Sequence, residues 1–413
     1  MNRYTGGIFV APLLGTALFV LVSFDAQWRG EWNWTVDTVT GSTVLTAPLA
    51  GSVGAYIAAT QRRLDPLIAP SVRGWLVPVL SGFRAWLLAL GVYAITCVTA
   101  LTMTFLANHG GPLSLWALLI GPAVLAFCCM AGAALGWWWP HRLAAVFAAP
   151  ALFLVGAFGP GPVADLLRQG PVTGSLAGLK YDARVWCLQV CALTAATVLI
   201  ACALVPRRRS RKTLAKAAGA AVVSGSIFIG ACLGLMTENA ERFAASSEKP
   251  TSCMGAPQAC LAPSNVRFLE DVSQALSTAS EVLQGAGVNM PERYEQLLAG
   301  YQPPETSGLL TNVDDSPFSD LRRGAILVAR PAACAAWTDP SEPPPDEAFQ
   351  AQELLTEWIV GSGGEETYPW SAESEEWLSR PHRTDRTAWV VRTFSQLRRC
   401  QLSEVAMPWA VPQ

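Results

Sequence analysis

The sequence lacks the motifs on which most enzyme predictions depend. It has no Gly-Lys dipeptide, so the phosphate-binding GxxxxGK[ST] loop is absent. It has no GxSxG nucleophile motif, and its three histidines are isolated, with no HExxH spacing. These absences predict that the chain is not an enzyme and has no cofactor or metal site. If ATP powers the protein, the ATPase is a separate polypeptide.

Charge is also scarce, at 15% of residues against 51% hydrophobic residues, and the mean hydropathy is +0.31. Such a chain is too apolar for an ordinary soluble domain. No Asp, Glu, Lys, Arg or His lies near the middle of a predicted span. This absence argues against a proton-coupled or ion-coupled carrier, although backbone carbonyls can also bind cations.

Seven apolar stretches predict seven membrane-spanning helices. Six are about as long as a bilayer requires, roughly 20 residues, and the fifth is shorter. Dropping the fifth would place its flanking Arg142 on the opposite side from the basic turn described next, so we retain it. The stretches are about 7–24, 42–59, 83–106, 115–137, 143–158, 185–205 and 217–236.

The turn at 206–216, PRRRSRKTLAK, has the densest positive charge in the chain and joins the last two apolar stretches. Basic loops between spans stay in the cytoplasm. This predicts a cytoplasmic N-terminus and places everything after Met236 outside the cytoplasm. Residues 1–236 carry a net charge of +10 and residues 237–413 a net charge of −12, and the acidic part argues against nucleic acid as a partner. The topology determinants are Arg207, Arg208, Arg209, Arg211 and Lys212.

The stretch before the second span and the second span itself each have a recognisable pattern. The preceding stretch, 25–41, contains Trp28, Trp32 and Trp34, which predicts a loop at the outer membrane boundary; aromatics that bind a ligand are the alternative. The span itself has small residues every fourth position, which predicts an interior helix in close contact with a neighbour. These small residues are Ala47, Gly51, Ala55 and Ala59, and Ala50, Gly54 and Ala58.

The segment after the second span, QRRLDPLIAPSVRG, is basic and amphipathic. The distribution of positive charge places it in the cytoplasm. It is either a short helix on the inner membrane surface or a site where a cytoplasmic partner docks. The candidate docking residues are Arg62, Arg63, Leu64, Leu67, Ile68 and Arg73.

Seven of the eleven cysteines lie in predicted spans, where a thiol behaves as a small apolar side chain. The other four lie in the exported part, where an even number suggests disulfides. Of three possible pairings we favour Cys253 with Cys260 and Cys334 with Cys400; the alternative is four free thiols.

The sequence predicts three regions: a polytopic transmembrane domain at 1–236, a linker at 237–263 and an α-rich extracytoplasmic domain at 264–413. The domain begins with an amphipathic helix at 264–284. Its acidic clusters, such as Glu365 and Glu366, match no calcium-loop spacing. Shorter helical patterns occur at 291–299, 346–360, 372–378 and 384–397, and the best strand candidate is 325–329.

The arrangement of the first two spans, with AGSVGAYIAATQRRLDPLIAPSVR, resembles the permease-like membrane subunits of actinobacterial type-2 ABC exporters. The exported part, with SCMGAPQACLAPSNVRFLEDVSQALSTASEVLQGAGV and AWVVRTFSQLRRC, is similar to a C-terminal domain on uncharacterised members of that group. The resemblance implies a bacterial plasma membrane location, a separate ATP-binding subunit that docks on 62–74, and homo- or heterodimerisation through the spans. Typical members have six spans, whereas seven are predicted here.

The leading hypothesis is therefore a noncatalytic membrane-spanning subunit of an ABC-type export system, with an outer domain for cargo recognition or gating. The alternative is a membrane-anchored sensor or scaffold whose outer domain binds a ligand or an envelope component.

Overall fold

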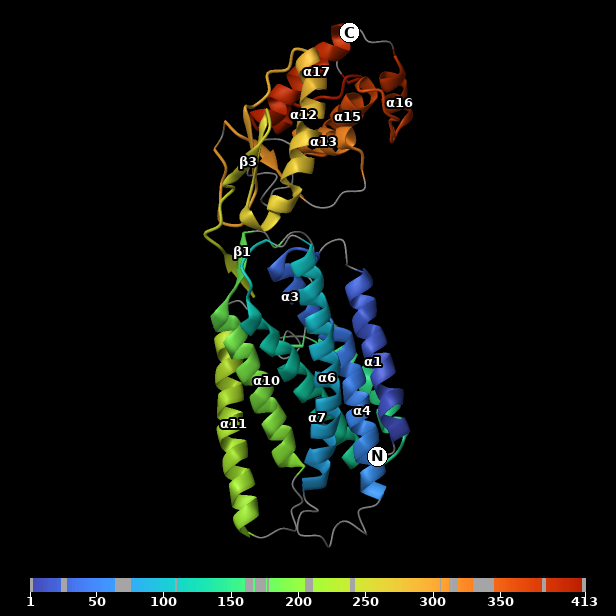
Figure 1. The fold of residues 1–413 in the computed structure, drawn as a ribbon, viewed down its shortest axis with the longest axis vertical. Helices are drawn as coiled ribbons and strands as arrows, with labels where there is room; N and C mark the ends of the chain where they lie inside the picture. Colours follow the sequence, from blue (N-terminus) through green and yellow to red (C-terminus); the bar gives the residue numbers. More distant parts are fainter. Residues whose placement is uncertain are drawn as a thin grey trace. The chain divides into compact units, whose positions relative to one another are not determined.

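The computed structural model describes residues 3–23, 28–63, 76–107, 110–159, 166–167, 176, 178–204, 211–237, 242–304, 306–311, 313, 318–329, 345–380 and 384–410. The chain divides into two compact units (Figure 1). Unit 1 comprises Met1–Thr173 and Lys180–Ala244. Unit 2 comprises Gly174–Leu179 and Ala245–Gln413.

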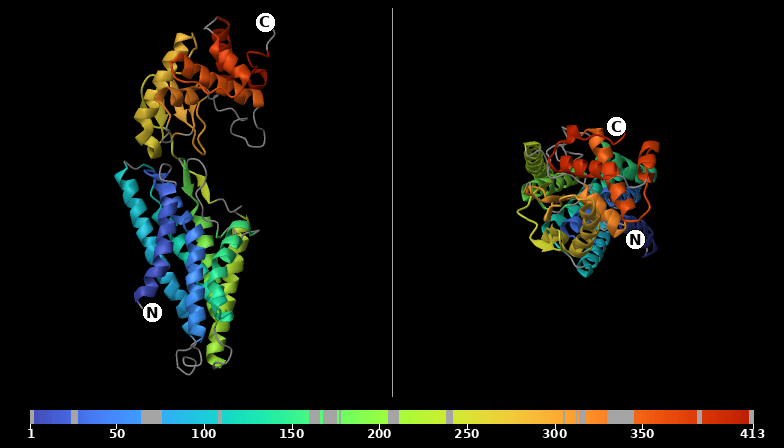
Figure 2. Two further views of the ribbon diagram at one scale, coloured as in Figure 1. Left: turned by 90° about the vertical axis from the view of Figure 1, so that its right-hand side faces the viewer. Right: turned by 90° about the horizontal axis from the view of Figure 1, so that it is seen from above.

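Unit 1 is a helical bundle in which the long helices lie side by side (Figures 1 and 2). Helix α4 is central, because it packs against α1, α6, α7 and α8. The helices are α1 (Arg3–Ser23), α3 (Trp32–Gly41), α4 (Thr43–Arg63), α6 (Val77–Leu106), η2 (Leu115–Leu119), α7 (Ile120–Trp138), α8 (Leu143–Phe158), α10 (Ala183–Ala203) and α11 (Arg211–Thr237).

Each of the seven predicted apolar stretches contains a helix, but five candidates in the described chain are long and apolar enough to cross a membrane. Two further apolar helices, Val10–Ser23 and Leu143–Phe158, are shorter. The fold class is therefore a mostly helical chain with several helices that are compatible with membrane spans. The five are Trp32–Arg63, Val77–Leu106, Leu115–Trp138, Ala183–Ala203 and Leu214–Thr237.

The outer surface of this bundle carries large apolar side chains, while many interior positions carry small ones. Phe105 on α6, Phe158 on α8 and Val222 on α11 are 63%, 74% and 70% exposed. By contrast, Ala47, Ala50, Ala55 and Ala58 of α4 are fully buried. A surface of large apolar groups is costly in water and favourable in lipid, so this distribution fits a bilayer environment.

The small residues of α4 permit close contact with α7, as the four-residue spacing predicts. A Cβ added at Gly132 would clash with the backbone carbonyl of Gly51, and one added at Gly136 would clash with that of Ala55. Only glycine on α7 therefore lets the two backbones approach this closely.

Two short strands, β1 (Leu179–Tyr181) and β2 (Phe243–Ala245), form a two-stranded sheet. The Asp182 N–H donates to the Arg242 carbonyl at 2.9 Å, and the Ser246 N–H donates to that of Gly178 at 2.7 Å. Beyond Met236 the chain leaves the bundle quickly, since α11 ends at Thr237 and β2 follows at 243. Phe243 packs against Tyr181 at 5.0 Å between ring centroids, which favours the strand at this position.

Unit 2 is a four-stranded sheet with helices, built around its own hydrophobic core. The strand order is β3-β4-β5-β6, with β3 and β4 antiparallel and the other two pairs parallel. Residues 237–263, predicted as a linker, contain β2, β3 and β4. The elements are β3 (Ser252–Met254), β4 (Gln258–Leu261), η3 (Pro263–Phe268), α12 (Leu269–Gly285), β5 (Arg293–Gln296), β6 (Gly308–Leu310), α13 (Asp320–Val328), α15 (Asp346–Ser362), α16 (Ala372–Ser379), α17 (Thr384–Arg398) and η4 (Leu402–Glu404).

Two predicted elements of unit 2 are wrong in type. The predicted strand at 325–329 is almost entirely the end of helix α13, which Ser319 caps by accepting a hydrogen bond from the Arg322 N–H. The predicted helix at 291–299 contains strand β5, which is paired on both sides by β4 and β6. Short apolar runs do not separate strand from helix, so tertiary pairing decides. The other four predicted helices of this region are present as η3 with α12, α15, α16 and α17.

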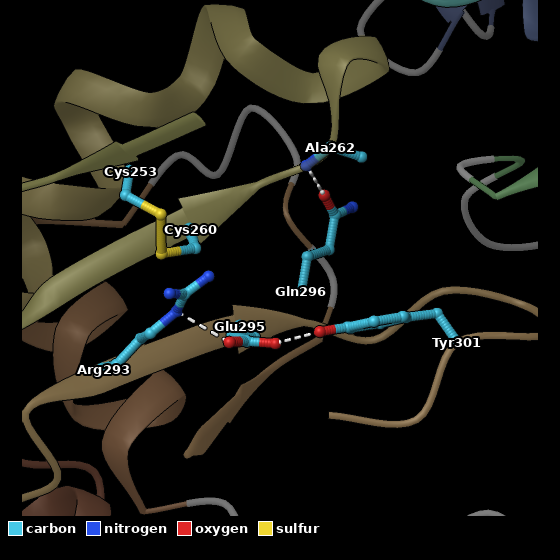
Figure 3. The surroundings of a disulfide bond; sticks show 7 residues. All are labelled: Cys253, Cys260, Ala262, Arg293, Glu295, Gln296 and Tyr301. Carbon is cyan, nitrogen blue, oxygen red and sulfur yellow. Dashed lines mark hydrogen bonds and ion pairs between the residues drawn. A yellow bond between two sulfur atoms is a disulfide. The ribbon is translucent and has the colours of Figure 1, made fainter. Parts of the chain in front are cut away.

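The predicted disulfide between Cys253 and Cys260 is present, and it joins directly opposed residues of β3 and β4. Figure 3 shows Glu295 of β5 close to it, between Arg293 and Tyr301. The Arg293 Nε lies 2.7 Å from Glu295 Oε1, and the Tyr301 hydroxyl donates to the other carboxylate oxygen. The buried Glu295 carboxylate is thus satisfied on both oxygens, as a buried charge requires.

Candidate functional site

The most distinctive site lies at the start of α4, in the short helix α3. All ten residues of α3 are buried. The expected outer loop at 25–41 is therefore wrong over 32–41, which is helical. Trp28, Trp32 and Trp34 face protein rather than a membrane boundary, since their exposed fractions are 0%, 8% and 7%.

Two acidic residues are buried in this site. Asp37 of α3 is fully buried and Glu31, just before α3, is 3% exposed. The predicted second span begins at 42, so Asp37 lies outside the stretches in which charged residues were sought. The candidate span of the structure begins at Trp32 and includes it. A carboxylate within an apolar bundle is costly, and such residues usually have a functional role.

The length of α4 places this site near one end of the bundle. Thr43–Arg63 has 21 residues, about what is needed to cross a hydrocarbon layer of roughly 30 Å. Asp37 precedes Thr43 by six residues, or about 9 Å of helix. It therefore lies at the opposite end of α4 from Arg62 and Arg63.

Aromatic side chains from β1, β2, η2 and α10 enclose the site. The rings of Tyr181 and Trp186 meet edge to face at 5.0 Å, and Trp116 packs against both. The Tyr181 hydroxyl donates a 2.8 Å hydrogen bond to the Asn33 carbonyl. Burial raises the pKa of Tyr181 well above its usual value, the charge of Asp37 raises it further, and that of Arg242 lowers it. Tyr181 is thus a neutral hydrogen-bond donor within electrostatic range of both charges.

A series of hydroxyl groups leads from α3 into α4. Thr40, Ser42 and Thr43 donate to carbonyls three residues earlier, and Thr46 donates to the Ser42 carbonyl. These bonds satisfy the hydroxyls locally, so they can be buried at low cost. Next to them is a cavity of about 10 Å³, with room for about one water molecule. Its lining residues are Leu13, Ala17, Ser42, Thr46, Ala89, Val92, Tyr93, Thr96 and Leu125.

Several buried polar atoms of unit 1 make no hydrogen bond to described residues. They include Thr38 Oγ1 of α3 and Gln189 Oε1 of α10, and the indole nitrogens of Trp34 and Trp186. Buried polar groups without partners are rare and costly unless water or a ligand satisfies them. The site therefore has both donors and acceptors for water or for a polar ligand.

The residues predicted as docking and topology sites are only partly described. Arg62 and Arg63 form the last turn of α4; the Arg62 guanidinium lies 4.8 Å from the Trp137 ring centroid, and Arg63 Nε donates to the Pro140 carbonyl at 3.4 Å. Arg211 and Lys212 form the start of α11. Cys400 is disulfide-bonded, but its predicted partner is not described, so that pairing stays a prediction. Leu64, Leu67, Ile68, Arg73, Arg207, Arg208, Arg209 and Cys334 lie outside the described residues.

A helical pattern in the sequence could have identified α3. Trp32, Val36 and Val39 recur at spacings of four and three, as on one helical face, and all three are buried. Tryptophans also suit a membrane boundary, and the prediction of an outer loop on that ground does not reveal the buried Asp37. No sequence signal places Tyr181 and Arg242 at this site, because their position depends on the pairing of β1 with β2, which are far apart in the chain.

Comparisons of the chain with protein-family models, with curated proteins and with solved structures found no match. The class that the described structure supports is a helical protein compatible with membrane insertion, with a small sheet-containing C-terminal unit.

Proposed function

We propose that the protein is a noncatalytic membrane-spanning subunit of an ABC-type export system. The buried Asp37 site supports a transport role, because an acidic side chain enclosed within an apolar bundle is typical of a transport pathway. The ATP-dependent type is proposed from the sequence resemblance and from the missing phosphate-binding loop. The apolar outer surface of unit 1 supports membrane insertion. ATP would be hydrolysed by a separate subunit that docks at 62–74, and cargo would be recognised or gated by unit 2.

The proposal includes seven spans, with α1 and α8 crossing in addition to the five longer helices. At 16 residues, or about 24 Å, α8 is short, and local thinning of the bilayer would accommodate it. An odd number of spans would put the N-terminus and unit 2 on opposite sides of the membrane, and the basic turn at 206–216 assigns the N-terminus to the cytoplasm. The disulfides of unit 2 suit an oxidising compartment.

Co-purification tests the partner. The full chain is extracted in mild detergent, and we expect an ATP-binding cassette protein to accompany it. Combined replacement of Arg62, Arg63 and Arg73 by Gln should release that protein. The matched control is Arg184→Gln, which removes an exposed positive charge at the start of α10. Absence of an ATPase, or equal retention by both variants, would contradict the proposed partnership.

Thiol labelling tests the orientation. A Gln413→Cys variant in intact cells should react with a maleimide that cannot cross lipid, whereas the parent chain provides the background. Reaction only after lysis would place unit 2 in the cytoplasm and overturn the topology.

Asp37→Asn tests the site itself, because it removes the charge and nearly preserves the shape. We expect the ATPase to remain bound and its hydrolysis rate in liposomes to fall. An unchanged rate would mean that the buried carboxylate has no part in coupling.

The alternative function is a membrane-anchored sensor or scaffold. One observation favours it: unit 2 has an extensive core of its own, so it needs no helix of unit 1 to complete its interior. Such a domain can bind an external ligand or an envelope component independently of transport. Failure to find an ATPase in the co-purification would favour this function.

A further inference from the structure

Helix α17 of unit 2 has one buried and one open face. Its buried face includes Trp389, Val390, Phe394 and Leu397. Its open face borders a shallow groove of about 610 Å³, which is within the usual size range of small-molecule sites. The residues that line this groove are Thr387, Ala388, Val391, Arg392, Ser395, Gln396, Arg399, Gln401 and Glu404.

Positions 388, 392, 395 and 399 follow the spacing of a single helical face. The C-terminal end of the groove is formed by η4, which folds back against α17. The Gln401 N–H donates to the Gln396 carbonyl at 3.0 Å, and Gln396 Nε2 donates to the Glu404 carbonyl at 3.0 Å. The groove is therefore defined by backbone and side-chain bonds rather than by a loose segment.

Two arginines of this face, Arg392 and Arg399, are exposed and have no side-chain partner among the described residues. Other arginines of the same helix are used structurally. Arg386 donates to the Leu378 carbonyl at 3.1 Å, and Arg398 donates to the Ser307 carbonyl at 3.1 Å. Arg392 and Arg399 are seven residues apart, or about 10 Å along the helix. Their flexible side chains can therefore reach one oxyanion together or hold two anionic groups.

The remaining lining groups indicate what else the ligand carries. Thr387, Ser395 and Gln401 provide hydroxyl and amide groups, while Ala388 and Val391 provide a small apolar floor. The Glu404 carboxylate accepts a 3.4 Å hydrogen bond from Gln401 Nε2 and can also accept from a ligand hydroxyl. A purely anionic ligand would be repelled by Glu404, whereas a ligand with hydroxyl groups would be held by it.

We infer that this groove binds a phosphorylated sugar or polyol, with the phosphate on Arg392 and Arg399 and the hydroxyls directed to Glu404 and its neighbours. Guanidinium groups bind phosphate through charge-assisted hydrogen bonds. The net charge of −12 on residues 237–413 does not prevent this, because charges beyond about 8 Å are largely screened at physiological salt. The inference concerns unit 2 alone and does not depend on the transport role.

The test uses the full chain in detergent and saturation-transfer NMR at millimolar ligand. Glucose 6-phosphate represents a free sugar phosphate, and glycerophosphoglycerol represents a phosphate-linked polymer. Glucose and inorganic phosphate are the controls for each half of the ligand; inorganic phosphate, which has no non-exchangeable proton to observe, is tested as a competitor of the sugar phosphate. We expect at least one of the two phosphorylated probes to bind, and both controls to bind more weakly. The probe that binds more tightly shows whether the ligand is a free sugar phosphate or part of a phosphate-linked polymer.

Arg392→Gln and Arg399→Gln should each weaken that binding by about tenfold or more, because each removes a charge-assisted hydrogen bond. Lys249→Gln is the matched control, since Lys249 is an exposed cation of unit 2 outside the groove, and it should leave binding unchanged. Both arginines are exposed, so the variants should fold, and circular dichroism checks this. No binding of either probe, equal binding by inorganic phosphate, or full binding by the double variant would overturn the inference.

Discussion

Tyr181 and Asn33 are 148 residues apart in the chain, and the Tyr181 hydroxyl donates a 2.8 Å hydrogen bond to the Asn33 backbone carbonyl. This bond joins β1 to α3 and holds the aromatic enclosure over the buried Asp37 site. Because both groups are buried, no bulk water is available to replace the bond.

Tyr181→Phe should therefore lower the free energy of unfolding of unit 1 by about 1–2 kcal/mol, since it leaves the Asn33 carbonyl without this donor. Thermal unfolding in detergent, followed by tryptophan fluorescence, measures the effect. Tyr368→Phe is the control, because Tyr368 is 62% exposed and its hydroxyl makes only a long, solvent-exposed hydrogen bond of 3.5 Å to the Glu366 carboxylate. Equal melting temperatures for the two variants would show that the bond contributes nothing.

Gly132→Ala and Gly91→Ala should have opposite effects on stability. An added methyl group at Gly132 of α7 clashes with the Gly51 carbonyl of α4, so the helices must separate, at a cost of about 1–3 kcal/mol or more. Gly91 of α6 has no atom within 4 Å of an added Cβ. There, alanine should stabilise the helix by about 0.5–1 kcal/mol. Melting temperatures in detergent provide the comparison, and the same sign for both variants would contradict the packing argument.

The helices of unit 1 were predictable because apolar stretches of bilayer length leave a strong sequence signal. Even the contact of α4 with a neighbour followed from Ala47, Gly51 and Ala55, whose spacing of four puts them on one face. The short helix α3 was not predicted, because tryptophan occurs both at membrane boundaries and in protein interiors.

Unit 2 was less predictable, for two physical reasons. Residues 325–329 form a short, continuous apolar run whose pattern fits a strand as well as a helix. Only the Ser319 cap and the packing of α13 against α12 and α15 make them part of a helix. Strand β5 is fixed by pairing with β4, at least 32 residues earlier in the chain, and with β6, at least 12 residues later. Such pairings depend on the whole fold rather than on a local pattern.

Glu357→Ala and Glu376→Ala should separate the effects of buried and exposed ion pairs. Glu357 pairs with Arg322 at 2.5 Å, with side-chain exposures of 10% and 13%, and it also accepts from the Tyr368 N–H at 2.7 Å. Its removal leaves Arg322 largely buried without its carboxylate, which should cost about 3–5 kcal/mol. Glu376 pairs with Arg380 at exposures of 67% and 51%, so its removal should cost at most about 1 kcal/mol. Urea unfolding of the full chain in detergent, followed by circular dichroism, measures both; similar midpoints would contradict the assigned role of burial.

Tyr294→Phe should keep or raise stability at neutral pH and reduce the loss of stability in alkali. Tyr294 is 1% exposed, and its hydroxyl has no hydrogen-bond partner among the described residues, so removing it eliminates a desolvation cost. Burial raises the pKa of Tyr294 in the folded state above its ordinary value of about 10. A raised folded pKa contributes stability that is complete below pH ~10 and is lost as the pH rises through the folded value. The wild type should therefore lose stability above pH ~10 more steeply than Tyr294→Phe does.

Tyr301→Phe is the informative comparison for this alkaline effect. The pKa of Tyr301 is also raised, chiefly by its hydrogen bond to the Glu295 carboxylate and then by burial, so its removal should likewise flatten the alkaline loss. Unlike Tyr294→Phe, however, this variant loses a bond to a buried carboxylate and should be less stable at pH 7. Unfolding in urea at pH 7 and in steps above pH ~10 distinguishes the two variants. Lower stability of Tyr294→Phe at pH 7 would mean that its hydroxyl is hydrogen-bonded in solution, and an unchanged alkaline slope would mean that Tyr294 does not ionise on unfolding.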